Sequence, residues 1–212
     1  MAIATGQALA KTIAVPIRLP GRSYLLFKRM FDLVLAVLLL IICGIPMLLL
    51  AAAIRLSSKG PALFWSDRVG IENHIFRMPK FRSMRIDAPQ LATHLFQDPA
   101  SYLTPIGGFL RKTSLDELPQ LLSILMGDIS FVGPRPALFN QDDLVALRTE
   151  RGVQKLIPGL TGWAQINGRD SISIPAKVEL DAYYLAHFSV WFDIKILFMT
   201  LFKVLRTEDI SH

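Results

Sequence analysis

The feature that most constrains this chain is a long apolar stretch near its N-terminus. No charged side chain occurs from Leu33 to Ile54. At ~1.5 Å of rise per residue, a helix over this stretch would be roughly 33 Å long, which matches the hydrocarbon core of a bilayer. The stretch begins too far into the chain and is too long for a signal peptide, and no small-residue cleavage site follows it. We therefore expect a membrane anchor.

A proline stands inside this stretch. Pro46 lacks a backbone N–H and its ring clashes with the carbonyl of Ile42, while Gly44 loosens the backbone beside it. Both flanks of the stretch are basic: Arg18, Arg22, Lys28 and Arg29 precede it, and Arg55 and Lys59 follow it. Because a single span carries its Lys and Arg mainly on the cytoplasmic side, two basic flanks favour a re-entrant helix that turns back at Pro46. A spanning helix with a proline kink is the alternative.

The net charge indicates an anionic partner but does not identify which kind. The net charge of +6 suits nucleic acid, anionic lipid or a phosphorylated substrate. Cys43 is the sole cysteine, which excludes an intrachain disulfide, and the four histidines show no zinc-binding spacing. Asp32, at the polar edge of the apolar stretch, is predicted to cap the helix or to pair with Lys28 or Arg29.

The rest of the chain predicts a mostly helical α+β fold. From Gly60 onward, short apolar pieces separated by Gly, Pro and charge indicate short strands and turns. Helices are expected at 115–126, about 137–151, 176–187 and 190–206, and the glycines of 158–170 indicate a loop. The helix at 190–206 is apolar around most of its circumference, so it suits either a core or a membrane interface.

Two readings apply to the stretch from Ser114 to Pro119. Ser-x-x-Glu is a capping-box pattern, and proline is accepted in a first helical turn, so a helix is predicted to start near Asp116. The alternative interpretation gives the carboxylates of Asp116 and Glu117 a role in catalysis. An ionised Asp116 held beside the cations Arg111 and Lys112 is suited to nucleophilic attack on phosphorus.

Two other segments offer cations to an anionic ligand. Arg135 stands between two prolines in "GDISFVGPRP" (127–136), which favours a pre-positioned guanidinium fork for phosphate. In "MPKFRSMR" (78–85), strand alternation places Lys80, Arg82 and Arg85 on one face, which is either solvated or bound to an anion. A surface arginine in a stiff turn is the alternative for Arg135.

Two loci remain less specific. The loop 161–170 carries Asn167, Arg169 and Asp170 and can approach a ligand, although it matches neither a Walker A loop nor GxGxxG. Asp181 and Asp193 lie in predicted helices, where most carboxylates are solvated or salt-bridged.

Together these segments resemble the bacterial sugar transferase family, the monotopic polyprenyl-phosphate phosphoglycosyl transferases. The resemblance covers roughly residues 28–206, and the matching segments occur in family order: "KRMFDLVLA", the proline-containing anchor, "GPALFWSDRVG", "KFRSM", "LRKTSLDELPQL", "GDISFVGPRP", "PGLTGWAQINGRD" and "ELDAYY". In many members a serine precedes the anchor proline, whereas Ile45 does so here.

The resemblance implies transfer of a sugar-1-phosphate from a UDP-sugar to undecaprenyl phosphate, with release of UMP, as the first membrane step of surface-glycan assembly. Asp116 matches the proposed nucleophile and Glu117 the second carboxylate of the dyad. Mg²⁺ is the expected cofactor, held near Asp116. Arg135 matches a phosphate-binding arginine, and Lys80, Arg111 and Arg169 are carried over as substrate-binding residues.

The implied organisation is a tail (1–27), a re-entrant anchor helix broken at Pro46 (28–58), a catalytic domain (59–206) with interfacial helices, and a C-terminal tail (207–212). The expected location is the bacterial inner membrane, with the active site on the cytoplasmic face and membrane lipid as a partner; a homodimer is compatible with this. A non-enzymatic membrane adaptor is the main alternative function. A nucleic-acid binder ranks last because of the bilayer-length stretch.

Overall fold

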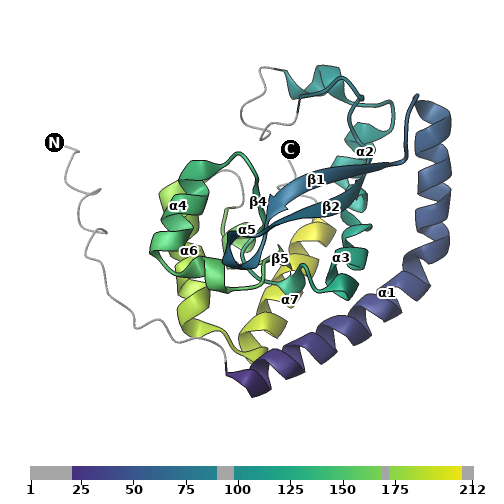
Figure 1. The fold of residues 1–212 in the computed structure, drawn as a ribbon. Coiled ribbons are helices and arrows are strands. Elements are labelled where there is room, and N and C mark those ends of the chain that lie inside the picture. Colours follow the sequence, from purple (N-terminus) through teal and green to yellow (C-terminus); the bar gives the residue numbers. More distant parts are fainter. Residues whose placement is uncertain (1–20, 90–97, 169–171, 207–212) are drawn as a thin grey trace.

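The computed structural model describes residues 21–89, 98–168 and 172–206 (Figure 1). Its helices are α1 (Arg22–Ser57), α2 (Gly107–Lys112), α3 (Gln120–Met126), α4 (Asp142–Glu150), α5 (Trp163–Ile166), α6 (Ile174–His187) and α7 (Val190–Arg206). Its strands are β1 (Leu63–Val69), β2 (Ile75–Phe81), β3 (Ser130–Val132), β4 (Ala137–Leu138) and β5 (Gly159–Thr161). Single 3₁₀ turns lie at Ile71–Asn73 (η2), Pro99–Tyr102 (η4), Leu115–Glu117 (η5) and Val153–Lys155 (η6). The predicted mixed, mostly helical α+β fold is confirmed.

Helix α1 is long and apolar enough to cross a membrane. It begins at Arg22, six positions before the expected boundary at residue 28, and it continues through Pro46 to Ser57. Figure 1 shows α1 running diagonally from its purple end and then bending upward. A proline inside a helix removes one hydrogen bond and causes such bends. The predicted break is therefore a bend in a continuous helix.

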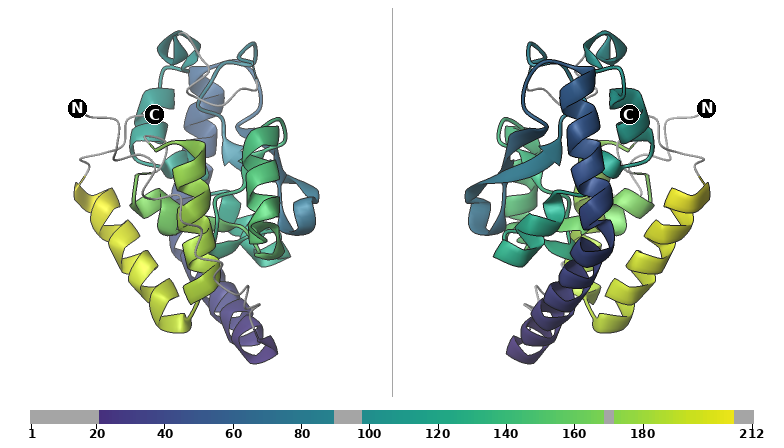
Figure 2. Two further views of the ribbon diagram at one scale, coloured as in Figure 1. Left: turned by 90° about the vertical axis from the view of Figure 1, so that its left-hand side faces the viewer. Right: turned by 90° about the vertical axis from the view of Figure 1, so that its right-hand side faces the viewer.

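Both halves of α1 pack against the rest of the protein (Figure 2). Before Pro46, Ala36 is fully buried in a core cluster that includes Ile124 and Phe131. After Pro46, Ile54 is fully buried in a second cluster with Phe81 and Leu110. The opposite face of α1 is apolar and exposed along its length, at Leu38, Ile41, Ile45, Leu48 and Leu49 among others.

Polar contacts fix the N-terminal end of α1. The Lys28 ammonium and the Tyr24 hydroxyl each donate to Asp193 Oδ2 of α7 at 2.8 Å. Asp32 accepts a hydrogen bond from the backbone N–H of Phe131 at 3.2 Å. Asp32 therefore binds β3, and it does not cap α1, whose N-cap is Gly21. The predicted ion pair is also wrong, because Lys28 binds Asp193 and Arg29 donates to backbone carbonyls of α3.

Two small sheets support the region that follows the anchor. Strands β2, β1 and β4 form an antiparallel sheet in that order, and β3 pairs in parallel with β5. The predicted helices at 176–187 and 190–206 are confirmed as α6 and α7. The predicted loop 158–170 instead contains β5 and α5, because β5 pairs with β3, a partner that local sequence does not show. The predicted helix at 137–151 starts later, at Asp142, after β4.

Candidate active site

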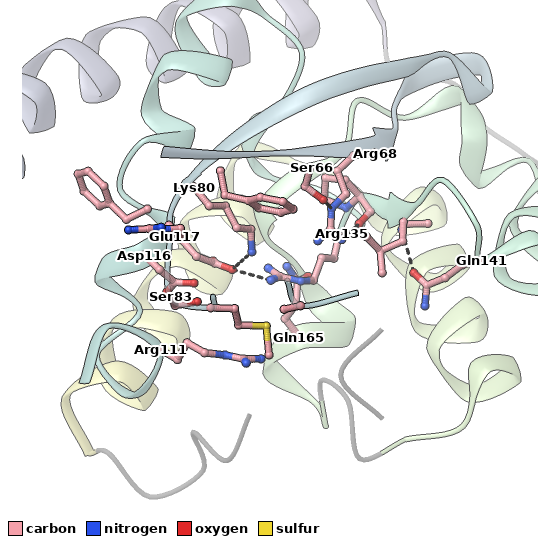
Figure 3. Close-up of a pocket in the computed structure, with 18 of the residues that line it drawn as sticks. Ser66, Arg68, Lys80, Ser83, Arg111, Asp116, Glu117, Arg135, Gln141 and Gln165 are labelled. Atoms are coloured by element: carbon pink, nitrogen blue, oxygen red, sulfur yellow. Dashed lines mark hydrogen bonds and ion pairs between the residues drawn. The ribbon is translucent and has the colours of Figure 1, made fainter. Parts of the chain in front are cut away.

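The candidate site centres on the Glu117 carboxylate, which two cations share. Lys80 Nζ donates to Glu117 Oε1 at 3.0 Å, and Arg135 Nη2 donates to the same oxygen at 2.5 Å. The three residues come from β2, from η5 and from the turn between β3 and β4 (Figure 3). Their side chains are largely buried, between 14% and 25% exposed, so solvent screens these charges weakly.

Asp116 lies beside Glu117 in the same short 3₁₀ turn. Ser114, just before the turn, has a left-handed backbone with φ of 56° and ψ of 17°, and its side chain caps nothing. The predicted capping box is therefore wrong. A helical turn does begin near Asp116, as predicted, but it is the single 3₁₀ turn η5 and not the α-helix. The left-handed residue ends the path of α2, and α3 begins only at Gln120, with Pro119 as its N-cap. Both carboxylates line one cavity as a result.

Burial sets the electrostatics of Asp116, which is only 9% exposed. Burial raises the pKa of the Asp116 carboxyl above its ordinary value, the neighbouring Glu117 raises it further, and Lys80, Arg135 and Arg111 act in the opposite direction. Within the described part of the chain, no side chain forms an ion pair with Asp116, whereas Glu117 has two. Asp116 is thus the carboxylate of the dyad that remains available to a ligand.

The cavity around the dyad has a volume of about 680 Å³ and is strongly cationic. Among the described residues, the charged side chains that line it are two carboxylates, Asp116 and Glu117, and eight cations: Arg68, Lys80, Arg82, Arg85, Arg111, Arg135, Arg148 and Lys177. Figure 3 shows Arg135 between the dyad on one side and Arg68 and Gln141 on the other. Guanidinium groups converging in this way suit a diphosphate or another polyanion.

Most of the predicted site residues meet in this cavity. Lys80, Arg111, Asp116, Glu117 and Arg135 all line it, although they come from four separate segments. Arg169 lies outside the described residues, so its predicted role stays a prediction.

The predicted basic face of a single strand is wrong, because β2 ends at Phe81. The Arg82 side chain, 4% exposed, donates to the backbone carbonyls of Lys59 and Ser58 at the end of α1. Arg85 is exposed and pairs with Asp87 at 2.5 Å. Of the three cations, Lys80 alone contacts the dyad among the described residues.

Three further residues that the sequence did not predict, Arg68, Arg148 and Gln141, line the same cavity. Arg148 forms an ion pair with Asp181 at 2.6 Å, and so the salt-bridged alternative for Asp181 is confirmed. Local sequence gave no signal for Arg148, because an arginine in the last turn of a helix usually faces solvent.

Known sequences resemble this chain over most of its length. The family described as bacterial sugar transferase matches residues 23–207. The uncharacterized sugar transferase EpsL of Bacillus subtilis (strain 168) is 43% identical over 190 residues, covering 89% of this chain and 92% of EpsL.

Longer relatives match over a part of their length. The UDP-glucose:undecaprenyl-phosphate glucose-1-phosphate transferase of Escherichia coli (strain K12) is 42% identical over 84% of this chain and 40% of its own. The UDP-N-acetylgalactosamine-undecaprenyl-phosphate N-acetylgalactosaminephosphotransferase of Aeromonas hydrophila is 37% identical over 88% of this chain and 45% of its own. This chain thus spans less than half of these two relatives and nearly all of EpsL. It belongs to the bacterial sugar transferase family.

Proposed function

We propose that this protein transfers a sugar-1-phosphate from a UDP-sugar to undecaprenyl phosphate, releasing UMP, as a first membrane step of surface-glycan assembly. The printed names of its E. coli and A. hydrophila relatives describe sugar phosphotransfer to undecaprenyl phosphate. The observation that carries the proposal is a buried Asp116 carboxylate facing a cationic cavity, beside a Glu117 that is already neutralised by two cations.

The proposed reaction has two displacements at one phosphorus. Asp116 attacks the phosphorus that carries the sugar, a bond forms from its carboxylate oxygen, and the bond to the UMP oxygen breaks so that UMP leaves with the electron pair. A phosphate oxygen of undecaprenyl phosphate then attacks the same phosphorus and displaces the Asp116 carboxylate. The products are undecaprenyl-diphosphate-sugar and UMP, and the enzyme returns to its starting state without a net gain or loss of protons.

The cations of the cavity would stabilise the negative charge of the bound diphosphate and of the UMP leaving group. Arg135 and Lys80 are held at the dyad by Glu117, and Arg111 lines the same cavity, so these donors are oriented before substrate arrives. We assign Glu117 the role of positioning them rather than of attacking phosphorus. Its carboxylate oxygen is occupied by two donors, which lowers its nucleophilicity.

Mg²⁺ is part of the proposal, and the donor set allows it. Within the described residues, no group of three or more His, Cys, Asp or Glu side chains could hold a metal alone. Mg²⁺ is commonly held by one or two carboxylates together with substrate phosphates, so Asp116 with a bound diphosphate fits that mode. When bound, the ion would offset phosphate charge during transfer.

The packing of α1 supports a re-entrant anchor with the active site on the cytoplasmic face of the inner membrane. Lys28, near one end of α1, binds Asp193, and Ile54, near the other end, packs on Phe81. About 39 Å of helix separates these two positions. A domain on one side of a bilayer does not reach both ends of a helix that crosses it. The exposed apolar face of α1 then enters the lipid, and the exposed aromatic side of α7 (Trp191, Phe198 and Phe202) lies at the interface.

A transfer assay tests this function. Detergent-solubilised protein is incubated with Mg²⁺, undecaprenyl phosphate and each of several UDP-hexoses, and release of UMP and formation of the lipid-linked sugar are measured. We expect one or a few donors to be turned over by the wild type and none by Asp116→Asn. Turnover in Asp116→Asn equal to that of the wild type would overturn the assignment of the nucleophile, and no turnover by the wild type with any donor would overturn the proposed reaction.

A further inference from the structure

The turn that carries Arg135 is held at its backbone by two other arginines. Arg148 Nη1 donates to the carbonyl oxygen of Arg135 itself at 2.8 Å. Arg68 Nη1 donates to the carbonyl oxygen of Pro136, the next residue, at 3.2 Å. The two prolines that flank Arg135 have no backbone N–H to donate. The turn is held instead through its carbonyl oxygens, which accept hydrogen bonds from these two arginine side chains.

Arg148 is in turn fixed by Asp181 of α6. Its Nε and Nη2 both donate to Asp181 Oδ2, at 3.0 Å and 2.6 Å. Both residues are buried, with Asp181 1% and Arg148 8% exposed. The planar guanidinium thus binds Asp181 through one edge and the Arg135 carbonyl through its remaining nitrogen. A guanidinium restrained at both edges has a single orientation, which a lysine cannot reproduce.

We propose that Arg148, oriented by Asp181, is a positioning residue that holds the Arg135 guanidinium against Glu117. The path runs from Asp181 through Arg148 to the Arg135 carbonyl, and from the Arg135 side chain to Glu117 Oε1. Its kinetic consequence rests on the proposed function, because there Arg135 and Glu117 act on the diphosphate. The "ELDAYY" segment gains a role in this way, since Asp181 belongs to it.

A merely structural role is the alternative, since a buried ion pair between α4 and α6 also ties two helices together. The chain offers a matched control for that role. Arg151, at the C-terminal end of α4, pairs with Glu179 of α6, and this pair also joins the two helices. Among the contacts of the described residues, Arg151 makes none with Arg135. The two pairs therefore differ in the contact that the proposal needs.

The kinetic test is a double-mutant cycle with Arg135. Arg148→Met/Asp181→Leu removes both buried charges together, which preserves folding better than removing one partner. In the wild-type background we expect this change to lower kcat by roughly 10- to 100-fold, the scale of a misplaced reacting group. In the Arg135→Ala background the same change should lower kcat less than about 2-fold, because the residue through which it acts is gone. Arg151→Met should leave kcat within about 2-fold.

A second measurement does not depend on activity. The side-chain Nε–H signal of Arg135 is assigned in ¹⁵N spectra of the full chain by its loss in Arg135→Lys. We expect Arg148→Met/Asp181→Leu to move this signal toward that of a solvated arginine, and Arg151→Met to leave it in place. An unmoved Arg135 signal, or equal losses of kcat in the wild-type and Arg135→Ala backgrounds, would overturn the proposal. If the wild type transfers no sugar-phosphate, the proposed function fails, and the Arg135 signal still decides the positioning role.

Discussion

Arg135 Nη2 lies 2.5 Å from Glu117 Oε1, the same oxygen that accepts from Lys80. One carboxylate oxygen therefore holds two cations from different segments of the fold. The pair of cations is oriented toward the cavity before any ligand binds, and the neighbouring Asp116 is left without an ion-pair partner among the described side chains. Under the proposed function the two carboxylates would have different tasks, Glu117 holding the cations and Asp116 meeting the ligand.

Replacing Glu117 with Gln should impair turnover more than donor binding. The amide would keep the size of the side chain but lose the charge that holds Lys80 and Arg135, and the two cations would repel each other. We expect kcat to fall by roughly 10²- to 10³-fold, the range for losing an oriented electrostatic group. Steady-state kinetics with Glu72→Gln, in the η2 turn away from the cavity, provides the control. A kcat equal to that of the wild type would show that the cations do not need Glu117.

Asp116→Asn should be more stable than the wild type. The raised pKa of Asp116 means that the folded state holds its proton more tightly than the unfolded state, so stability falls as pH rises through the folded pKa. At neutral pH the ionised carboxylate thus costs stability, and an uncharged Asn of the same shape removes that cost. Each kcal/mol recovered should raise Tm by roughly 2–4 °C for a chain of this size. Thermal unfolding at about pH 7.5, above the ordinary range of aspartate, measures it. A lower Tm for Asp116→Asn would contradict the assignment of a desolvated carboxylate.

The same pKa shift should appear in the pH dependence of the first chemical step. The proposed nucleophile must be ionised to react, and burial raises the pKa of Asp116. As the pH is lowered, the rate should therefore begin to fall at a higher pH than it would for an ordinary aspartate. Rapid-quench measurement of UMP release without acceptor, across a pH series, gives this profile. A rate that stays constant down to the ordinary pKa range of aspartate would argue against a buried nucleophile.

Much of the fold follows from the sequence because its signals are local. The uncharged run from Leu33 to Ile54 predicts a long helix, and the patterns of apolar residues at 176–187 and 190–206 predict α6 and α7. The β5 strand is different, because a three-residue strand forms only through its parallel pairing with β3. The local sequence of 158–170, with its glycines, therefore indicates a loop. Likewise, a proline bends α1 without ending it, because packing on both sides of the bend supports the helix.

The site residues that could be predicted are those whose side chains and immediate neighbours already indicate a reactive or anion-binding group. The Asp116–Glu117 pair and the proline-flanked Arg135 are distinctive in the sequence, and they meet in one cavity. The backbone of Ser114 was not predictable, since a serine before an acidic turn usually caps a helix and here is left-handed. Arg148 was also missed, because its importance comes from Asp181, a partner 33 positions away.

Both ends of α1 should be accessible from one side of the membrane. Cys43→Ala removes the sole cysteine, and Ser23→Cys and Lys59→Cys then place single thiols at exposed positions beyond each end of the apolar run. A membrane-impermeant maleimide added to inverted inner-membrane vesicles, whose cytoplasmic face is outside, should label both variants. In intact spheroplasts it should label neither. Opposite labelling of the two variants would mean that α1 spans the bilayer.

Intact-protein mass spectrometry can detect the proposed covalent phosphosugar intermediate on Asp116. Purified protein is mixed with Mg²⁺ and each of several UDP-sugars without undecaprenyl phosphate, quenched in acid and weighed. We expect a mass increase of one sugar-phosphate with the preferred donor, its loss on addition of undecaprenyl phosphate, and no increase in Asp116→Asn. Normal product formation without any adduct, or an adduct that persists in Asp116→Asn, would contradict it.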